Sequence, residues 1–369
     1  MSELISQGGF GCIFYPAFNS KGEVKKKSKM VSKLQINNFN GKNEILIGKI
    51  IRTFSKYNLY FLPTINVSSI KLASLDKNFT KKCNIISKND SDYLLLEITY
   101  LKNIRFQKLF TEFLKSKKHI LLIFFEIFEY VINSIEQLLN LNIVHFDLKE
   151  QNILYSLKYE NPRLLDFGIS IPFDYLNNDN IKNYFYIYAP EYFIWPLEVH
   201  VINYLLHVKD TLDLSDIEKI STKYVDNNIA LNIFSREFKQ NYTNLCIEFL
   251  KQFISNNDKN EIIKYLLTFY KTWDLYALSI LYLKFIGYIF HTGFYDSKII
   301  INFSQLLLLN ISPDPRNRLS IDNIKSLYKE IFYINESLDN YLELINNFKY
   351  DTIPVKKINT ELSILYKPS

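Results

Sequence analysis

The sequence predicts an α+β protein with two lobes, a small strand-rich lobe followed by a larger helical lobe. Between Leu4 and Leu101, short apolar runs alternate with Gly, Asn, Ser and Lys clusters, a pattern typical of strands, and one helix is expected around Asn43 to Thr53. From about Phe106 the apolar residues recur with helical spacing, interrupted between Ile143 and Ser170 by short strand-like pieces. This change of pattern places the boundary at a short hinge near Glu97 to Asn103.

The same patterns divide the chain into three regions. We expect residues 1–99 to form the first lobe, residues 100–333 the second lobe, and residues 334–369 a helical C-terminal tail. Two strongly apolar stretches, Ile120 to Ile132 and Leu275 to Phe294, contain charged residues. We expect both to be buried helices of a large core, so no membrane span is predicted.

Composition supports a globular protein. Of 369 residues, 48% are hydrophobic and 16% aromatic, which excludes the class of disordered proteins. Lys and Arg total 44 against 38 Asp and Glu, a net charge of +6 that mildly favours acidic or phosphorylated partners and predicts no specific nucleic acid. The densest basic stretch, Lys25, Lys26, Lys27 and Lys29, is expected to be a solvated turn between strands.

The cysteines predict a reducing compartment. Cys12, Cys83 and Cys246 lie far apart and lack the spacing of a metal site or a disulfide framework, so we expect free thiols. Met1 to Ile5 carries no basic region followed by an apolar run, so no signal peptide is expected. Together these observations predict a cytoplasmic protein.

The first functional signal is a glycine-rich turn between two predicted strands, Ser6-Gln7-Gly8-Gly9-Phe10-Gly11-Cys12-Ile13. Glycines let backbone amides approach phosphate oxygens without an intervening side chain. Lys33 ends the strand-like piece that begins at Met30, and Glu44 follows on the predicted helix. An ion pair between Lys33 and Glu44 would hold the lysine against nucleotide phosphates.

The second signal is a pair of loops between short strands. Ile143-Val144-His145-Phe146-Asp147-Leu148-Lys149-Glu150-Gln151-Asn152-Ile153-Leu154 is followed by Asp166-Phe167-Gly168. Magnesium prefers hard oxygen ligands and shares them with substrate phosphates, which suits Asn152 and Asp166. Asp147 is then free to accept the proton of an attacking hydroxyl, while Lys149 neutralises charge on a transferring phosphoryl group.

In this order, the glycine-rich loop, strand lysine, helix glutamate, catalytic loop and Asp-Phe-Gly resemble the signature of eukaryotic-type protein kinases. Ala189-Pro190-Glu191 resembles the end of the family's activation segment, Asp274-Leu275-Tyr276-Ala277-Leu278-Ser279 the start of its buried central helix, and Asp314-Pro315-Arg316-Asn317-Arg318 a late motif. The resemblance spans Ser6 to Arg318. It implies a bilobed protein-kinase-like fold, an ion pair between Glu191 and Arg318, and Mg-ATP as the phosphoryl donor, with Mn²⁺ as an alternative metal.

The resemblance also implies a role for each site residue. Lys33 would contact the α and β phosphates and Glu44 would hold it, while Asp147 would deprotonate the acceptor hydroxyl beside Lys149. Asn152 and Asp166 would bind the metal. The nucleotide would lie against Ser6, Gln7, Gly8, Gly9, Phe10 and Gly11, the adenine between Ile13 and Leu154, and the hinge from Glu97 to Thr99 would follow a gatekeeper at Leu96.

Some positions depart from the family pattern. Ser6 stands where the first loop glycine is usual, and Phe146 replaces the arginine that docks a phosphorylated activation loop. Glu191 and Asp274 lie 83 positions apart, which implies a helical insertion at about residues 192–271. The insertion and the Asn-, Ile- and Lys-rich composition resemble divergent kinases of large nucleocytoplasmic DNA viruses, which implies a location in host cytoplasm, with packaging in virions as a further option.

We therefore expect a serine/threonine protein kinase acting on protein substrates, of unspecified oligomeric state. A catalytically silent pseudokinase is the main alternative, although such modules commonly lose at least one of Lys33, Asp147, Asn152 and Asp166. A small-molecule kinase of the aminoglycoside or choline type shares the spacing between Asp147 and Asn152. The Asp-Phe-Gly and Ala-Pro-Glu motifs count against that second alternative.

Overall fold

The computed structural model describes residues 2–8, 11–25, 28–71, 75, 83–84, 92–106, 120–254, 258–291, 298–334, 338–339 and 341–342. The chain divides into two compact units, one formed by Met1–Leu109 with Gln137–Leu176, the other by Phe110–Glu136 with Asn177–Ser369. The first unit thus includes a second segment of chain that lies beyond the hinge expected from the sequence. The expected tail at residues 334–369 falls almost wholly outside the described residues.

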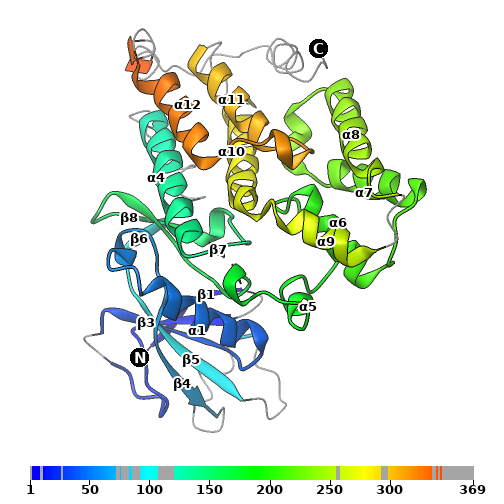
Figure 1. Cartoon of the computed structure of the whole chain (residues 1–369). Coiled ribbons are helices and arrows are strands. Elements are labelled where there is room, and N and C mark those ends of the chain that lie inside the picture. The colour runs from blue at the N-terminus through cyan, green and yellow to red at the C-terminus, as the bar shows by residue number, and fades with distance from the viewer. Residues whose placement is uncertain are drawn as a thin grey trace. The chain divides into compact units, whose positions relative to one another are not determined.

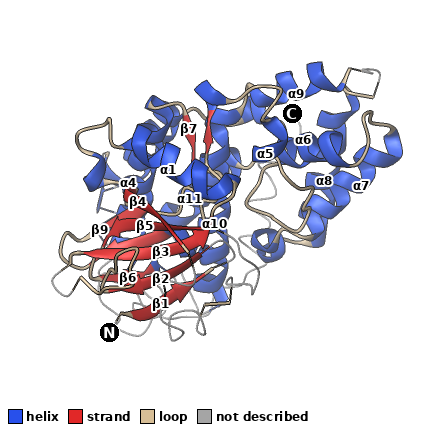
Figure 2. Ribbon diagram, turned by 90° about the horizontal axis from the view of Figure 1, so that it is seen from below, coloured by secondary structure: helices blue, strands red, loops and turns tan. Residues whose placement is uncertain are grey.

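The first unit begins with a five-stranded antiparallel sheet. Its strands are β1 (Glu3–Gln7), β2 (Gly11–Tyr15), β3 (Met30–Ile36), β4 (Thr64–Ile70) and β5 (Tyr93–Thr99), in the order β1-β2-β3-β5-β4 (Figure 2). Helix α1 (Phe39–Ile51) lies beside β4 (Figure 1). It begins where the Asn38 side chain accepts a hydrogen bond from the Gly41 amide, a favoured N-cap, and a short 3₁₀ turn (Tyr57–Leu59) follows it.

The alternation of side chains along the strands gives the sheet two different faces. Cys12, Phe14, Leu34, Tyr93 and Leu95 pack together in a buried apolar cluster on one face. The intervening residues of the same strands, Lys33 of β3 among them, point to the opposite face. This alternation decides which strand residues take part in the site.

Two smaller sheets complete the first unit. Strands β6 (Asn103–Arg105), β8 (Ile153–Ser156) and β9 (Asn161–Leu164) pair antiparallel in the order β6-β8-β9, and β7 (Ile143–Val144) pairs with β10 (Ile171–Pro172). A 3₁₀ turn at Glu150–Asn152 lies between β7 and β8, and a second at Phe173–Tyr175 follows β10. The two loops that carry the predicted catalytic residues are therefore framed by paired strands, as the sequence indicated.

The second unit is helical. It contains most of α4 (Ile120–Asn140), then α5 (Ile181–Tyr184), α6 (Leu197–His207), α7 (Leu214–Asp226), α8 (Arg236–Lys251), α9 (Lys259–Leu267), α10 (Trp273–His291), α11 (Lys298–Asn310) and α12 (Ile321–Tyr333), with 3₁₀ turns at Ile229–Ile233, Tyr270–Thr272 and Pro315–Asn317. Helices α10, α11 and α12 lie side by side, as do α7 and α8 (Figure 1). The segment expected as a helical insertion is indeed mostly helical.

Aromatic side chains form the core of the second unit. Phe124 of α4 packs against Tyr282 of α10, and Phe125 packs against Phe303 of α11. The Tyr282 hydroxyl donates a 2.8 Å hydrogen bond to the Phe124 carbonyl, and Tyr328 of α12 donates one of the same length to the Phe125 carbonyl. These two buried tyrosines thus satisfy their hydroxyls on the α4 backbone.

These elements confirm the mixed α+β prediction, with an antiparallel sheet in the N-terminal part and helices in the C-terminal part. Within the described residues, none of the helices combines the length and apolar character that crossing a membrane requires. The apolar stretches expected as buried helices correspond to α4 and α10.

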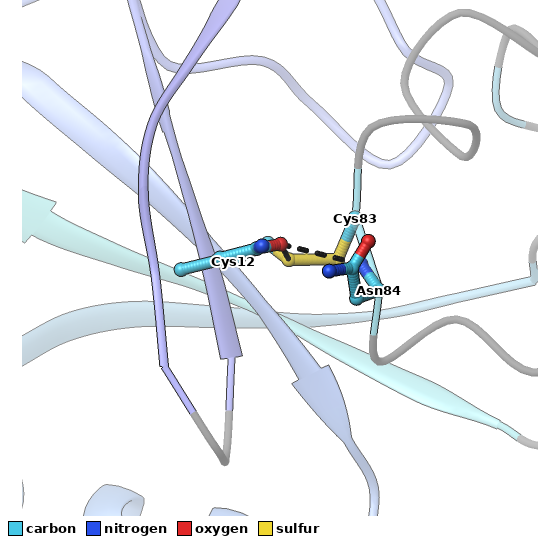
Figure 3. Close-up of a disulfide and its surroundings, with 4 residues drawn as sticks. Cys12, Cys83 and Asn84 are labelled. Carbon is cyan, nitrogen blue, oxygen red and sulfur yellow. Dashed lines mark hydrogen bonds between the residues drawn. A yellow bond between two sulfur atoms is a disulfide. The ribbon is translucent and has the colours of Figure 1, made fainter.

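One expectation about the cysteines is wrong. Cys12 on β2 and Cys83 form a disulfide although 71 positions separate them (Figure 3). Only Cys246 is free, and it is buried in α8. A second contact links the neighbouring Asn84 to β1, because the Asn84 amide donates a 3.3 Å hydrogen bond to the Gln7 side chain. The disulfide removes the support that absent cross-links gave to a reducing, cytoplasmic compartment.

Candidate active site

The glycine-rich turn is a hairpin between β1 and β2. Gln7 pairs with Cys12 and Ser6 with Ile13, and the Gly8 amide donates a 2.9 Å hydrogen bond to the Gly11 carbonyl. A Cβ on Gly11 would lie 3.0 Å from Lys33 Cε and 3.2 Å from the Leu34 carbonyl oxygen. Only glycine fits this close approach without displacing the lysine. Gly9 and Phe10, at the tip of the predicted turn, lie outside the described residues.

Lys33 is the centre of a buried ionic cluster. It lies in β3, 4% exposed, and its Nζ is 2.7 Å from Glu44 Oε2 and 2.8 Å from Asp166 Oδ1. Burial opposes the charged form of Lys33, but the charges of Asp166 and Glu44 outweigh it and raise its pKa above the ordinary value. For Glu44, burial outweighs the attraction of Lys33, so its pKa is raised. The predicted pair of Lys33 and Glu44 is therefore present, with Asp166 as a third member.

Asp166 begins a tightly held loop. Its backbone has a φ of 66°, in the left-handed region where residues other than glycine are uncommon. The next residue, Phe167, is buried against the rings of His145 and Phe61, at centroid distances of 5.1 and 6.1 Å. Burial opposes ionisation of Asp166, but the charge of Lys33 and its hydrogen bond lower the pKa. Asp166 is thus an anion held in an uncommon backbone conformation.

Asp147 is held by two neighbours on its own loop. Lys149 Nζ lies 2.8 Å from Asp147 Oδ1, and Asn152 Nδ2 donates to Asp147 Oδ2 at 2.9 Å and to its main-chain oxygen at 2.8 Å. The preceding residue, Phe146, has a φ of 66° and a buried ring. The predicted residues Asp147, Lys149 and Asn152 therefore form one hydrogen-bonded group.

Asn152 and Asp166 carry the side-chain oxygens that the sequence predicts for a magnesium site. The Asn152 amide uses its nitrogen for both contacts to Asp147, which turns its oxygen in the other direction. The Leu165 amide donates a 3.1 Å hydrogen bond to the Asn152 carbonyl, so the residue before Asp166 is tied to Asn152. Two oxygen donors suit a metal that completes its shell with water and phosphate. Over the described ranges, there is no group of three or more His, Cys, Asp or Glu with metal-site geometry.

An apolar cluster lies on the same face of the sheet as Lys33. Val31, Leu62 and Ile98 are buried at its centre, and Val31 and Ile98 are directly paired across β3 and β5. Around them pack Ile13, Tyr15, Tyr100, Leu101, Leu154 and Leu165. The structure thus brings together Ile13 and Leu154, the two residues predicted to enclose an adenine ring.

The predicted hinge needs correction. Glu97 lies inside β5, paired with Ser32 on one side and Asn66 on the other, and Leu96 pairs with Lys33. The Glu97 side chain binds Lys25 and accepts a 3.0 Å hydrogen bond from Asn66. Because its backbone is paired on both sides within the sheet, Glu97 is not placed to receive a base.

Ile98, near the end of β5, belongs to the apolar cluster. Thr99 is the last residue of β5, and Tyr100 and Leu101 follow it in the cluster. Ile98 lies within the predicted hinge, whereas Tyr100 and Leu101 lie just beyond it, and the run Tyr93 to Ile98 is almost entirely apolar. Such a run does not reveal which alternate residues face the site.

The second unit holds a buried ion pair, but with a different glutamate from the one expected. Arg318 donates to Glu198 through Nη1 at 2.6 Å and Nη2 at 2.9 Å, and Trp273 Nε1 donates to Glu198 Oε1 at 3.0 Å. Both side chains are at most 1% exposed. Glu191 is exposed. The expected pairing of Glu191 with Arg318 is therefore wrong.

A sequence signal for the true partner existed. Trp195-Pro196-Leu197-Glu198 has the same proline-to-glutamate order as the motif, one residue more widely spaced than in Ala189-Pro190-Glu191, and it opens helix α6. Only the shorter spacing, in Ala189-Pro190-Glu191, matches the family pattern. In comparisons with known proteins, neither a family model nor a curated protein matches the chain.

Proposed function

We propose that this chain is an ATP-dependent protein kinase with a kinase-like bilobed fold, which transfers the γ-phosphate of Mg-ATP to serine or threonine hydroxyls of proteins. The observation that carries the proposal is the ionic cluster of Lys33, Glu44 and Asp166, formed from three separate parts of the chain. A buried lysine held between two carboxylates is a fixed positive charge, which a nucleotide phosphate site requires.

The neighbouring groups supply the other parts of the reaction. The hairpin between Gly8 and Gly11 would cover the phosphates, while the metal, when bound at Asn152 and Asp166, would neutralise charge on them. Asp147 would orient the acceptor hydroxyl and take its proton. Phosphoryl transfer needs positioning and charge stabilisation more than covalent chemistry, so fixed groups of this kind are sufficient.

Lys149 has a separate role in this proposal. Its Nζ lies 2.8 Å from Asp147 Oδ1, so the ion pair would hold the carboxylate in place beside the acceptor hydroxyl. The same ammonium group would then stabilise charge on the transferring phosphoryl group. Both roles depend on a cation that stays beside Asp147, which is what the ion pair provides.

The adenine would lie in the apolar cluster around Val31 and Ile98. Flat apolar surface with few polar groups is typical of such binding sites. The main chain of Thr99 to Leu101, which follows Ile98, would bind the polar edge of the adenine instead of Glu97. The activation segment is proposed to extend from Asp166 to Glu198, because Glu198 is the glutamate that Arg318 binds.

Transfer of labelled γ-phosphate from Mg-ATP to casein and to a basic protein tests the proposal, followed by phosphoamino-acid analysis. Asp147→Asn keeps the size of the side chain and removes the base, so labelling of serine and threonine should fall at least about 100-fold, the usual contribution of such a base. Asp322→Asn, at an exposed position of α12, is the matched control and should behave as wild type.

The outcomes separate the alternatives. Labelling lost in Asp147→Asn and kept in Asp322→Asn supports a protein kinase. Binding of a fluorescent ATP analogue without transfer by the wild-type protein would instead favour a pseudokinase. Equal labelling by Asp147→Asn and wild type would contradict the role of Asp147.

A further inference from the structure

Asn43 makes contacts that the proposed reaction has not used. It precedes Glu44 on α1 and is 3% exposed. Its Nδ2 donates a 3.0 Å hydrogen bond to the Gly168 carbonyl and a 2.8 Å hydrogen bond to the Ser170 carbonyl. Both amide hydrogens of one buried side chain are thus engaged by the loop that begins at Asp166.

The contacts of Asn43 and Glu44 hold two different parts of the site. Glu44 binds Lys33, which in turn binds Asp166. Asn43 binds the main chain two and four residues after Asp166. The position of one helix turn therefore fixes both the side chain of Asp166 and the backbone that follows it.

The loop needs this support because its conformation is not favoured by its own sequence. Asp166 has a φ of 66°, an uncommon backbone conformation that persists only where surrounding contacts enforce it. From the other side, the Ser170 hydroxyl donates a 2.9 Å hydrogen bond to the His145 carbonyl. From α1, Asn43 contacts the same loop through its two hydrogen bonds.

We propose that Asn43 is a positioning residue, which couples the placement of α1 to the metal-binding conformation of the Asp166 loop. Only a side chain with two N–H groups on one nitrogen can satisfy both carbonyls from this position. If Asn43 no longer donates, the loop loses the contacts that hold Asp166 toward Lys33 and the metal. The meaning for catalysis rests on the proposed kinase function, but the coupling itself does not.

Asn43→Asp tests this role with almost no change in size. The carboxylate would replace two donors by acceptors that face two carbonyl oxygens, which costs more than the loss of the two hydrogen bonds alone. Asn38→Asp is the matched control on the same helix. Asn38 is exposed and accepts from the Gly41 amide, and aspartate is an equally favoured N-cap there.

Two measurements separate positioning from a general loss of stability. Hydrogen exchange by mass spectrometry should show faster exchange in residues 165–170 of Asn43→Asp, with Asn38→Asp unchanged. In transfer assays, the Mg²⁺ concentration for half-maximal rate should rise about tenfold or more, as expected for two lost hydrogen bonds, while KM for the protein substrate stays the same. Asn43→Ser, which keeps one donor and adds no charge, serves if Asn43→Asp does not fold.

Faster exchange confined to residues 165–170 supports the coupling, even if wild-type protein shows no transfer and the kinase proposal fails. Unchanged exchange in this segment overturns the coupling. So does an increase spread evenly over the whole first unit, since that result indicates a structural role only. An unchanged Mg²⁺ requirement in an active Asn43→Asp enzyme overturns the link to metal binding.

Discussion

The ion pair of Glu198 and Arg318 makes a quantitative prediction about stability. Removing one partner of a buried pair leaves the other charge uncompensated, which costs about 3 to 5 kcal/mol in the free energy of unfolding. Glu198→Gln keeps an oxygen for the Trp273 indole but turns an amide toward a guanidinium that can only donate. Because both side chains are at most 1% exposed, water cannot replace the lost acceptor, so we expect about 3 kcal/mol or more.

Urea unfolding followed by tryptophan fluorescence measures this change. Glu191→Gln is the control, since Glu191 is exposed and its substitution should alter the free energy of unfolding by less than about 0.5 kcal/mol. Replacing both partners, as in Glu198→Leu with Arg318→Met, should recover part of the loss because no unpaired charge remains. Equal effects of Glu198→Gln and Glu191→Gln would refute the assignment of Glu198 as the partner.

Two other features lead to stability predictions. Burial lowers the pKa of His200 to about 4, although a hydrogen bond with the Trp195 backbone partly offsets this effect. Between pH 6.5 and 4, the imidazole of His200 is therefore protonated in the unfolded chain but not in the folded protein. The free energy of unfolding should fall by about 3 kcal/mol from pH 6.5 to 4, a slope that His200→Gln should remove in acid titrations. Reduction of the Cys12–Cys83 disulfide should lower it by about 4 kcal/mol by chain entropy, given the 71-residue separation. Dithiothreitol should not affect Cys12→Ser/Cys83→Ser protein, and a dithiothreitol-insensitive wild type would contradict the disulfide.

The charged and polar residues of the site were predictable because each belongs to a short motif with a fixed place in the fold. Lys33 follows from its strand and Glu44 from the next helix, while Asp147, Asn152 and Asp166 lie on loops between short strands. Chemistry that requires a charge at a fixed backbone position leaves a local sequence signal. In the structure these residues lie in the first unit, where Lys33 contacts Glu44 and Asp166, and Asn152 contacts Asp147.

Asn43 had no such signal. An asparagine beside a glutamate on a helix is ordinarily a solvated residue, and its partners, the carbonyls of Gly168 and Ser170, are main-chain atoms more than 120 positions away. Main-chain acceptors exist at every position, so no residue type in the sequence marks them. Contacts of side chains to distant backbone are therefore the part of a site that sequence patterns predict least well.

The disulfide was missed for a related reason, and its place in the sheet limits what it does. Spacing rules detect cysteines that are close in sequence, whereas Cys12 and Cys83 meet only because β2 is folded into a sheet. On β2, Cys12 faces the cluster of Phe14 and Leu34, while Ile13 pairs with Lys33 and faces the apolar cluster of the site. The cross-link therefore lies on the opposite side of the sheet from the ionic cluster. Reduction of the disulfide should therefore weaken the hairpin of β1 and β2 without removing any group proposed to contact the nucleotide.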